Sequence, residues 1–224
     1  RDFDARCSVG LDAFMRMHQH KRVPEDEASK TGVLAADLKG PLPPSAQQQK
    51  YFMVMVKRST KVGFYANLPS KESYNVMEGV KGFQLDLRSY WRCHGDGGKE
   101  LCGHMEQLLK DNLLVPTSTG GYDPQANADA ENRIGLVTGV MKAQFRQSGV
   151  PLLYWDENGP HANRIVNVAP IAKGDPPLIS EYLEVHKGDR ELAQQDFSKL
   201  GIENWPPWGC ECHAYVHKET REGT

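Results

Sequence analysis

The amino-acid sequence predicts a mixed α/β fold in which helices flank a central sheet. Short apolar runs rich in β-branched and aromatic residues alternate with longer stretches whose apolar residues recur every three or four positions. Hydrophobic residues make up 39% of the 224 residues and charged residues 25%, which suits a globular chain with a hydrophobic core. No apolar run approaches the roughly 18 residues that span a bilayer, so no membrane partner is expected.

The expected elements follow the order strand, hairpin, helix, strand, helix, strand, helix. The first strand is TGVLAAD, residues 31–37, and the runs YFMVMVKR and KVGFYANL form a hairpin joined by Ser59 and Thr60. Further strands are expected at YWRCHG and LLVPTS, and helices at about 71–87, 99–112, 128–148 and 152–167, the first of them capped by Ser70. The tail from residue 171 is Pro-rich and is expected to be irregular. This order is compatible with a ribonuclease H-like core, although pattern alone leaves several α/β folds open.

The longest expected helix carries an apolar stripe and two glycines. The stripe, at steps of three and four, consists of Ile134, Val137, Met141 and Phe145. This face should pack on the sheet, and Glu131, three positions before the stripe, extends it toward the helix start. Gly135 and Gly139 lie on another face, and each costs about 1 kcal/mol relative to Ala. They either permit a close backbone approach or mark a weakly constrained surface.

Three acidic residues stand at the ends of predicted elements. Asp37 ends the first strand, Asp96 lies in a Gly-rich turn after a later strand, and Glu131 opens the long helix. Clustered carboxylates repel one another, and Mg²⁺ or Mn²⁺, which prefer oxygen ligands, offset that repulsion. Two such ions about 3.5–4 Å apart can activate an attacking oxygen and stabilise a leaving one at phosphorus. Ordinary solvated carboxylates are the alternative, since acidic residues are common.

Each of the three acids also has distinctive neighbours. These are Gly40-Pro41 after Asp37, then Gly97, Gly98 and Glu100 after Asp96, and finally Pro124, Gln125 and Asn127 ahead of Glu131. Together they resemble the Asp, Asp, Glu catalytic core of retroviral and retrotransposon integrases, in particular the Ty1/copia group. The resemblance covers about residues 30–170 and continues in WGCECHAYVHKETREG, which is similar to a Gly-Cys-x-Ala-Tyr-Val-His stretch that follows copia-type cores.

The resemblance implies a polynucleotidyl transferase that performs DNA 3′-end processing and strand transfer. Two Mg²⁺ or Mn²⁺ ions would be held by Asp37, Asp96 and Glu131. The partner would be DNA, with two or more copies of the chain assembled on DNA ends, in the cytoplasm and nucleus. The expected DNA contacts are Tyr122, Gln125 and Asn127 in the loop before the third acid, and Arg133, Lys142 and Arg146 on the long helix. Turn and helix-cap roles are an equal alternative for the loop residues. For the basic residues around the hairpin, a solvated surface is favoured over phosphate contacts; these are Lys50, Lys57, Arg58 and Lys61.

By the same resemblance, residues 1–30 are a linker and the vestige of an upstream zinc-binding region. Residues 31–175 are the catalytic core, and residues 176–224 are a C-terminal extension. Where that family has a Cys-x-x-Cys pair, this chain has Cys7 and Gly10, so no four-ligand zinc site is expected in it. The chain lacks an initiator Met and is expected to be part of a longer polyprotein. Its five cysteines, without framework spacing, suggest reduced thiols inside the cell.

Two other functions stay open. The formal net charge of −2 is unusual for a nucleic-acid binder, and with Gly10 and the helix glycines it fits a catalytically decayed, nucleic-acid-binding remnant. A metal-dependent nuclease on the same fold is the other alternative. The presence of all three acids favours the active transferase, and the absence of a G-x-S-x-G motif agrees with a reaction that needs no covalent enzyme intermediate.

Overall fold

The computed structural model describes residues 31–83, 85–96, 102–118, 127–170 and 174–210. Its strands are β1 (Val33–Lys39), β2 (Tyr51–Lys57), β3 (Gly63–Leu68), β4 (Arg92–Gly95) and β5 (Val115–Ser118). Its α-helices are α2 (Ser73–Lys81), α3 (His104–Asp111), α4 (Ala128–Ser148), α5 (Trp155–Val168), α6 (Pro177–Val185) and α7 (Arg190–Ser198). Three short 3-10 helices are η2 (Leu87–Ser89), η4 (Leu152–Tyr154) and η5 (Ile202–Asn204). Among the described helices, none combines the length and apolarity that crossing a membrane requires.

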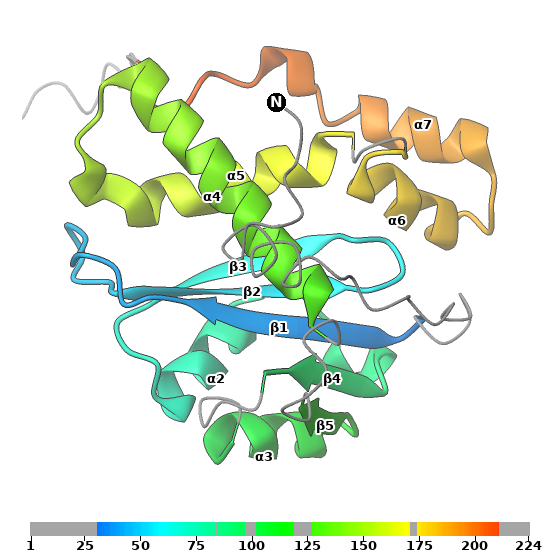
Figure 1. Ribbon diagram of the computed structural model, residues 1–224. Helices are drawn as coiled ribbons and strands as arrows, with labels where there is room; N and C mark the ends of the chain where they lie inside the picture. The colour runs from blue at the N-terminus through cyan, green and yellow to red at the C-terminus, as the bar shows by residue number, and fades with distance from the viewer. Residues whose placement is uncertain (1–30, 84, 97–101, 119–126, 171–173, 211–224) are drawn as a thin grey trace, which may run out of the picture. The chain divides into compact units, whose positions relative to one another are not determined.

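The five strands form one mixed sheet in the order β3-β2-β1-β4-β5 (Figure 1). The first three strands are antiparallel neighbours, whereas β4 pairs with β1, and β5 with β4, in parallel. A parallel neighbour requires a crossover, and α2 and α3 supply the two crossovers. The predicted mixed sheet with flanking helices is therefore confirmed.

Each face of the sheet has its own hydrophobic core, because successive strand residues point to opposite sides. Leu34, Ala36 and Cys93 pack with residues of α2 and α3 on one face. Ala35 and its neighbours on β2 pack with α4 and α5 on the other face. Figure 1 shows these two layers, with α2 and α3 on one side of the strands and α4 and α5 on the other. Asp37, two residues after Ala35 on β1, points to the face that carries α4 and α5.

Helix α4 forms over the residues that the sequence predicts for it. Of its stripe, Ile134, Val137 and Met141 are buried against Ala35 and the β2 side chains, and Phe145 packs beside them. Gly149 ends the helix in the left-handed conformation, at φ 68°, and its N–H donates to the Phe145 carbonyl. The stripe prediction is confirmed, and so is the use of this face against the sheet.

The two glycines of α4 face open space. A Cβ atom built on Gly135 or Gly139 meets no heavy atom within 4 Å among the described residues. We therefore expect Gly135→Ala and Gly139→Ala each to raise the free energy of unfolding by about 1 kcal/mol, because Ala has the higher helix propensity. Urea denaturation monitored by circular dichroism measures this. A loss of stability in either variant would show that the glycine is needed for a close contact.

Helix α5 contains the sequence Asn158-Gly159-Pro160, which shapes its contact with β3. Pro160 has no N–H, so the carbonyl of Asp156 one turn earlier loses its helical donor. The side-chain amide of Asn67 on β3 donates to that carbonyl instead, at 2.8 Å. Gly159 leaves room for the hydroxyl of Tyr65, also on β3, to lie against the helix. Gly159 and Pro160 would weaken an isolated helix, but here they allow α5 to pack closely against strand β3.

Three predicted helices have different limits in the structure. The helix predicted at 99–112 is α3, which begins at His104, after the N-cap residue Gly103. The helix predicted at 71–87 covers only α2, since Gly82 ends it, and Leu87–Ser89 form the separate turn η2. The N-cap position is Glu72, not Ser70, although the Ser70 hydroxyl accepts a hydrogen bond from the Glu72 N–H. The helix predicted at 152–167 begins with the 3-10 turn η4 before α5 proper.

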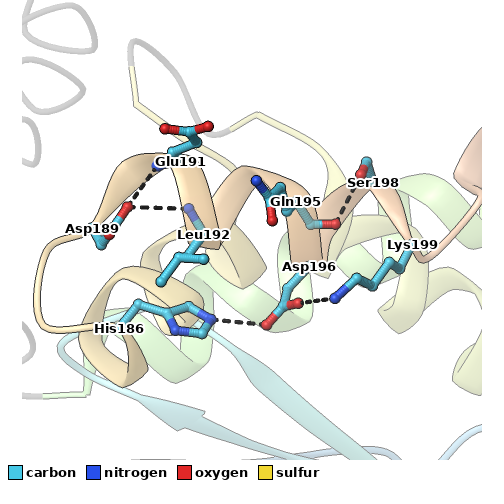
Figure 2. Close-up of polar contacts among 8 residues, drawn as sticks. All are labelled: His186, Asp189, Glu191, Leu192, Gln195, Asp196, Ser198 and Lys199. Atoms are coloured by element: carbon cyan, nitrogen blue, oxygen red, sulfur yellow. Dashed lines mark hydrogen bonds and ion pairs between the residues drawn. The ribbon is translucent and has the colours of Figure 1, made fainter.

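The tail predicted to be irregular contains a helical hairpin, so that prediction is wrong. Pro177 is the first residue of α6, where a missing N–H costs nothing. At the start of α7, the Asp189 carboxylate accepts from the N–H groups of Glu191 and Leu192 (Figure 2). On α7, Asp196 contacts His186 at the end of α6 and Lys199 at the end of its own helix. Hydrogen bonds from Lys199 and then His186 lower the pKa of the Asp196 carboxyl below its ordinary value.

Candidate active site

Asp37 on β1 and Asp96, which directly follows β4, are neighbours by the register of these parallel strands. The β1–β4 ladder ends at the pair Ala36 and Gly95, and the next residue of each chain segment is one of the two aspartates. Neighbouring strands are about 4.8 Å apart, and side-by-side residues of a parallel pair point to the same face. Asp37 follows Ala35 by two positions, so both aspartates face the side of the sheet that carries α4. Asp37 is partly buried and its Oδ1 accepts from the Leu38 N–H at 2.8 Å, whereas Asp96 is exposed.

The start of α4 is fixed to β1 next to Asp37. Asn127, 2% exposed, donates from its side-chain amide to the carbonyl of Ala36 at 3.0 Å. The N–H of Glu131 donates to the Asn127 carbonyl at 3.2 Å, so Glu131 lies one helical turn beyond this anchor. The same end of the sheet therefore carries Asp37, Asp96 and the first turns of α4.

The direction of Glu131 follows from a second anchor on the same helix. Asp129 points to the β2–β3 turn, where its carboxylate pairs with Arg58 at 3.1 Å and Lys61 at 2.9 Å. At about 100° per residue, Glu131 projects roughly 160° away from Asp129. Glu131 is exposed and lies on the side of α4 turned away from that hairpin. Within the described ranges, no group of three or more His, Cys, Asp or Glu side chains is close enough to hold a metal ion.

Further polar residues of β4 and β5 lie on the same face of the sheet as the aspartates. His94 pairs with Ala35 across the ladder, and it precedes Asp96 by two positions. His94 is 3% exposed, with Nδ1 at 2.9 Å from Thr117 Oγ1, and Arg92 Nε donates to the same hydroxyl at 2.8 Å. Neither His94 nor Thr117 is among the residues predicted for the site. The signal was available for His94, because strand alternation puts residues two apart on one face.

Two of the predicted DNA contacts have structural roles instead. Asn127 is buried, and its amide joins α4 to β1. Arg133 is 3% exposed, and its guanidinium donates to Asn163 Oδ1 at 2.6 and 2.9 Å, to the Asn163 carbonyl at 2.9 Å and to Asn167 Oδ1 at 2.5 Å. Burial among these neutral groups lowers the pKa of Arg133 to about 10. Neither side chain is placed to contact DNA, and we correct the prediction for both.

Lys142 and Arg146, the other predicted DNA contacts on α4, lie on the side of the helix that carries Glu131. Both are exposed, and at 100° per residue Lys142 is within about 20°, and Arg146 within about 60°, of the direction of Glu131. The face of α4 that begins with Glu131 therefore ends in two positive charges. Of the remaining predictions, Tyr122 and Gln125 lie outside the described residues, as do Cys7 and Gly10.

The basic residues around the β2–β3 turn are used within the protein. Lys57 pairs with Glu181 on α6, and Arg58 and Lys61 pair with Asp129 on α4. Burial on its own raises the pKa of Asp129, but the hydrogen bonds and charges of Lys61 and Arg58 outweigh burial and lower it. These ion pairs join the turn to α4 and α6, so a protein-surface role for this set is favoured over phosphate binding.

Two solved structures share this arrangement of strands and helices. A chain of the simian T-cell lymphotropic virus intasome, solved in complex with PP2A regulatory subunit B56 gamma, aligns over 66% of this chain with a TM-score of 0.56 and 12% identity. The alignment spans 52% of that chain, about half of its length. The catalytic core domain of BIV integrase aligns over 70% of this chain and 97% of its own length, with a TM-score of 0.52 and 16% identity. This chain has the fold of a retroviral integrase catalytic core.

The fold is the part of the predicted resemblance that these comparisons establish. No family model and no curated protein matches the sequence. Membership of the Ty1/copia group therefore stays a prediction, as do the three-part domain division and the roles of the acids. In this chain the end of β4 lies beside β1, and the start of α4 is joined to β1 at Ala36; Asp37, Asp96 and Glu131 belong to these three segments.

Proposed function

We propose that this chain is the catalytic core of a retrotransposon integrase, which processes DNA 3′ ends and joins them to target DNA. The observation that carries the proposal is the β1–β4 register, which sets Asp37 beside Asp96 on the face where Asn127 fixes the start of α4. A pair of adjacent aspartates with a glutamate one helical turn from the anchor is an oxygen-rich donor set. Such a set suits Mg²⁺ or Mn²⁺ rather than softer metals.

The three carboxylates would act as ligands of two divalent ions. Asp37 on β1 and Asp96 directly after β4 would supply two of the ligand side chains, and Glu131 in the first turn of α4 would supply the third. The ions, when bound, lower the barrier to in-line attack of water or a DNA 3′-hydroxyl on a phosphodiester. The strands hold Asp37 and Asp96 in place during this step, because both belong to or directly follow paired backbone in the centre of the sheet.

The DNA strand would run along the exposed face of α4. Glu131 lies at its start, and Lys142 and Arg146 supply phosphate contacts about 16 and 22 Å further along the helix axis. The chain as a whole carries a formal charge of −2, so affinity for DNA should be modest and should fall steeply with salt. As the resemblance to integrases implies, two or more copies would assemble on paired DNA ends, in the cytoplasm and nucleus; a structural neighbour of this chain comes from an intasome.

Metal binding tests the proposal directly. We expect Mn²⁺ or Mg²⁺ to raise the melting temperature, because an ion that binds only the folded state adds about 2.7 kcal/mol at a hundred times its dissociation constant. For a chain of this size that is about 5–10 °C. Asp96→Asn and Glu131→Gln should lose most of this rise, whereas Asp175→Asn, at an exposed ion pair with Arg190, should keep it.

The same titration, together with a DNA-joining assay, separates the alternatives. A decayed remnant that only binds nucleic acid would show no metal-dependent rise in any variant. If Glu131→Gln bound Mg²⁺ normally and was destabilised without it, Glu131 would be a structural residue and the site would lose its third ligand. A nuclease on this fold would show the metal response and cleave DNA but would not join a 3′ end to a target.

Measurements of DNA binding distinguish the exposed residues of α4 from its buried residues. Lys142→Gln should weaken duplex binding and reduce the slope of log K against log salt by about one, because one phosphate contact is lost. Arg133→Gln should leave that slope unchanged and should instead lower stability by about 1–3 kcal/mol, since Asn163 and Asn167 lose their donor. Fluorescence anisotropy over a salt series, together with urea denaturation, measures both. An unchanged slope in Lys142→Gln would remove this residue from the DNA path.

A further inference from the structure

A pocket lies between α5 and the segment that follows η5. Its volume is about 320 Å³, near the lower end of the range for small-molecule sites. Its walls include two indoles, two prolines, an imidazole and a guanidinium, from Trp205, Trp208, Pro206, Pro207, His161 and Arg164. This surface is far along α4 from the acids, since Trp208 contacts Phe145 and Glu131 is about 21 Å away along the helix axis.

The aromatic walls are held rigidly. Trp208 packs edge-on against Phe145 at 4.9 Å between ring centroids, and the Trp205 indole N–H donates to the Leu200 carbonyl at 3.0 Å. A Cβ atom on Gly209 would come within 2.7 Å of Ser148, so the segment lies directly against the turn after α4. In Figure 1 this segment, drawn in orange to red, runs from η5 to the end of α4.

The charge of the pocket is positive. The Arg164 guanidinium lies over the Trp205 ring, 4.5 Å from its centroid, and its side chain is exposed. Burial, and then the charge of Arg164, lower the pKa of His161, so the imidazole is neutral at pH 7 and the arginine supplies the charge. None of the described residues that line the pocket is acidic. Arg146, next to Phe145, adds a second exposed cation at the same end of α4.

We propose that this pocket binds an unpaired nucleotide of a nucleic-acid strand, with the base stacked on the indoles and the phosphate at Arg164. Indole faces stack on any base, and an adjacent arginine binds phosphate, which is the usual combination in single-strand binding surfaces. The inference rests on the proposed function, because the strand would be the DNA that passes along α4 from Glu131 to Arg146. A proline-rich peptide would fit the apolar walls, but it would not use the exposed cations Arg164, Arg146 and Lys142.

Anisotropy with a fluorescein-labelled (dT)₁₀ strand, and with a duplex of the same length, tests the inference. Trp205→Leu should weaken binding of (dT)₁₀ about tenfold, within the range measured for loss of one base stack. Arg164→Gln should weaken it several-fold and reduce its salt slope by about one. Trp205→Tyr, which keeps a stacking surface, should bind as the unchanged chain does, and so should the control Arg190→Gln on α7. Duplex binding should change little in all four variants.

Binding of (dT)₁₀ at unchanged strength by both Trp205→Leu and Arg164→Gln would overturn the inference. If Trp205→Leu fails to fold, Arg164→Gln alone tests the inference, because the Arg164 side chain is exposed and its replacement should leave the fold intact. Failure of the proposed function would look different. Asp37→Asn should still bind (dT)₁₀ normally, so a chain that lacks metal-dependent joining but shows the Arg164 and Trp205 effects would retain the pocket and lose the integrase assignment.

Discussion

Asp37→Asn and Asp96→Asn will each reduce metal-dependent strand transfer by at least about a thousandfold while leaving the fold intact. A metal ion stabilises the charge of a phosphoryl transition state by several kcal/mol, and each 1.36 kcal/mol is a factor of ten in rate. The amide keeps the shape of the carboxylate, and at position 37 it can still accept from the Leu38 N–H. The loss should therefore appear in activity and not in stability.

The measurement is a joining assay with a labelled DNA end and a plasmid target in Mn²⁺. Asp175→Asn is the matched control, because it makes the same chemical change at an exposed ion pair worth less than about 1 kcal/mol. Circular dichroism and melting temperature confirm that each variant is folded. Near-normal joining by either Asp37→Asn or Asp96→Asn would remove that residue from the site, whatever the fold.

Local sequence patterns were sufficient to predict the long helix α4 and the strands of the sheet. Helix α4 is predicted to its last residue, because its stripe has a clear helical period and Gly149 provides the left-handed stop. The sheet order was compatible with the predicted succession of elements, and the neighbouring positions of Asp37 and Asp96 follow from two strands that end in acids. The helical hairpin α6–α7 was missed because Pro176 and Pro177 suggested an irregular chain, although Pro at the first helical position is also a start signal.

The incorrect predictions at the site concern residues whose roles depend on contacts with distant parts of the sequence. Arg133 precedes Val137 by four residues, so it lies on the buried stripe of α4, and only the positions of Asn163 and Asn167 on α5 explain how a guanidinium is accommodated there. Asn127 is the N-cap residue of α4, as one of the two alternatives expected, but its side-chain amide does not cap the helix and instead donates to Ala36, ninety-one residues earlier on β1. A single sequence shows which residues share a helix face, but it does not show which groups meet that face.

Gly159→Ala will destabilise the protein by about 3 kcal/mol or more, in contrast to the same substitution at Gly135 or Gly139. A Cβ atom at this position would come within 2.0 Å of the Tyr65 hydroxyl and 2.2 Å of its ring carbon Cζ, where real Cβ contacts do not occur. The ring cannot move aside freely, because it stacks on Phe52 at 5.0 Å and its hydroxyl donates to Asn67 at 3.0 Å. The gain of about 1 kcal/mol in helix propensity is smaller than the cost of such overpacking.

The comparison with Gly139→Ala isolates the cause, because both substitutions add one methyl group to a helix and only one of them meets a neighbour. At about 2–4 °C per kcal/mol, Gly159→Ala should lower the melting temperature by roughly 6–12 °C, and Gly139→Ala should raise it slightly. Tyr65→Leu removes the ring tip, so adding Gly159→Ala in that background should cost much less. A double-mutant cycle gives this coupling as a free energy. If Gly159→Ala costs the same with Tyr65 and with Leu at position 65, the close fit of β3 against α5 is not what this glycine provides.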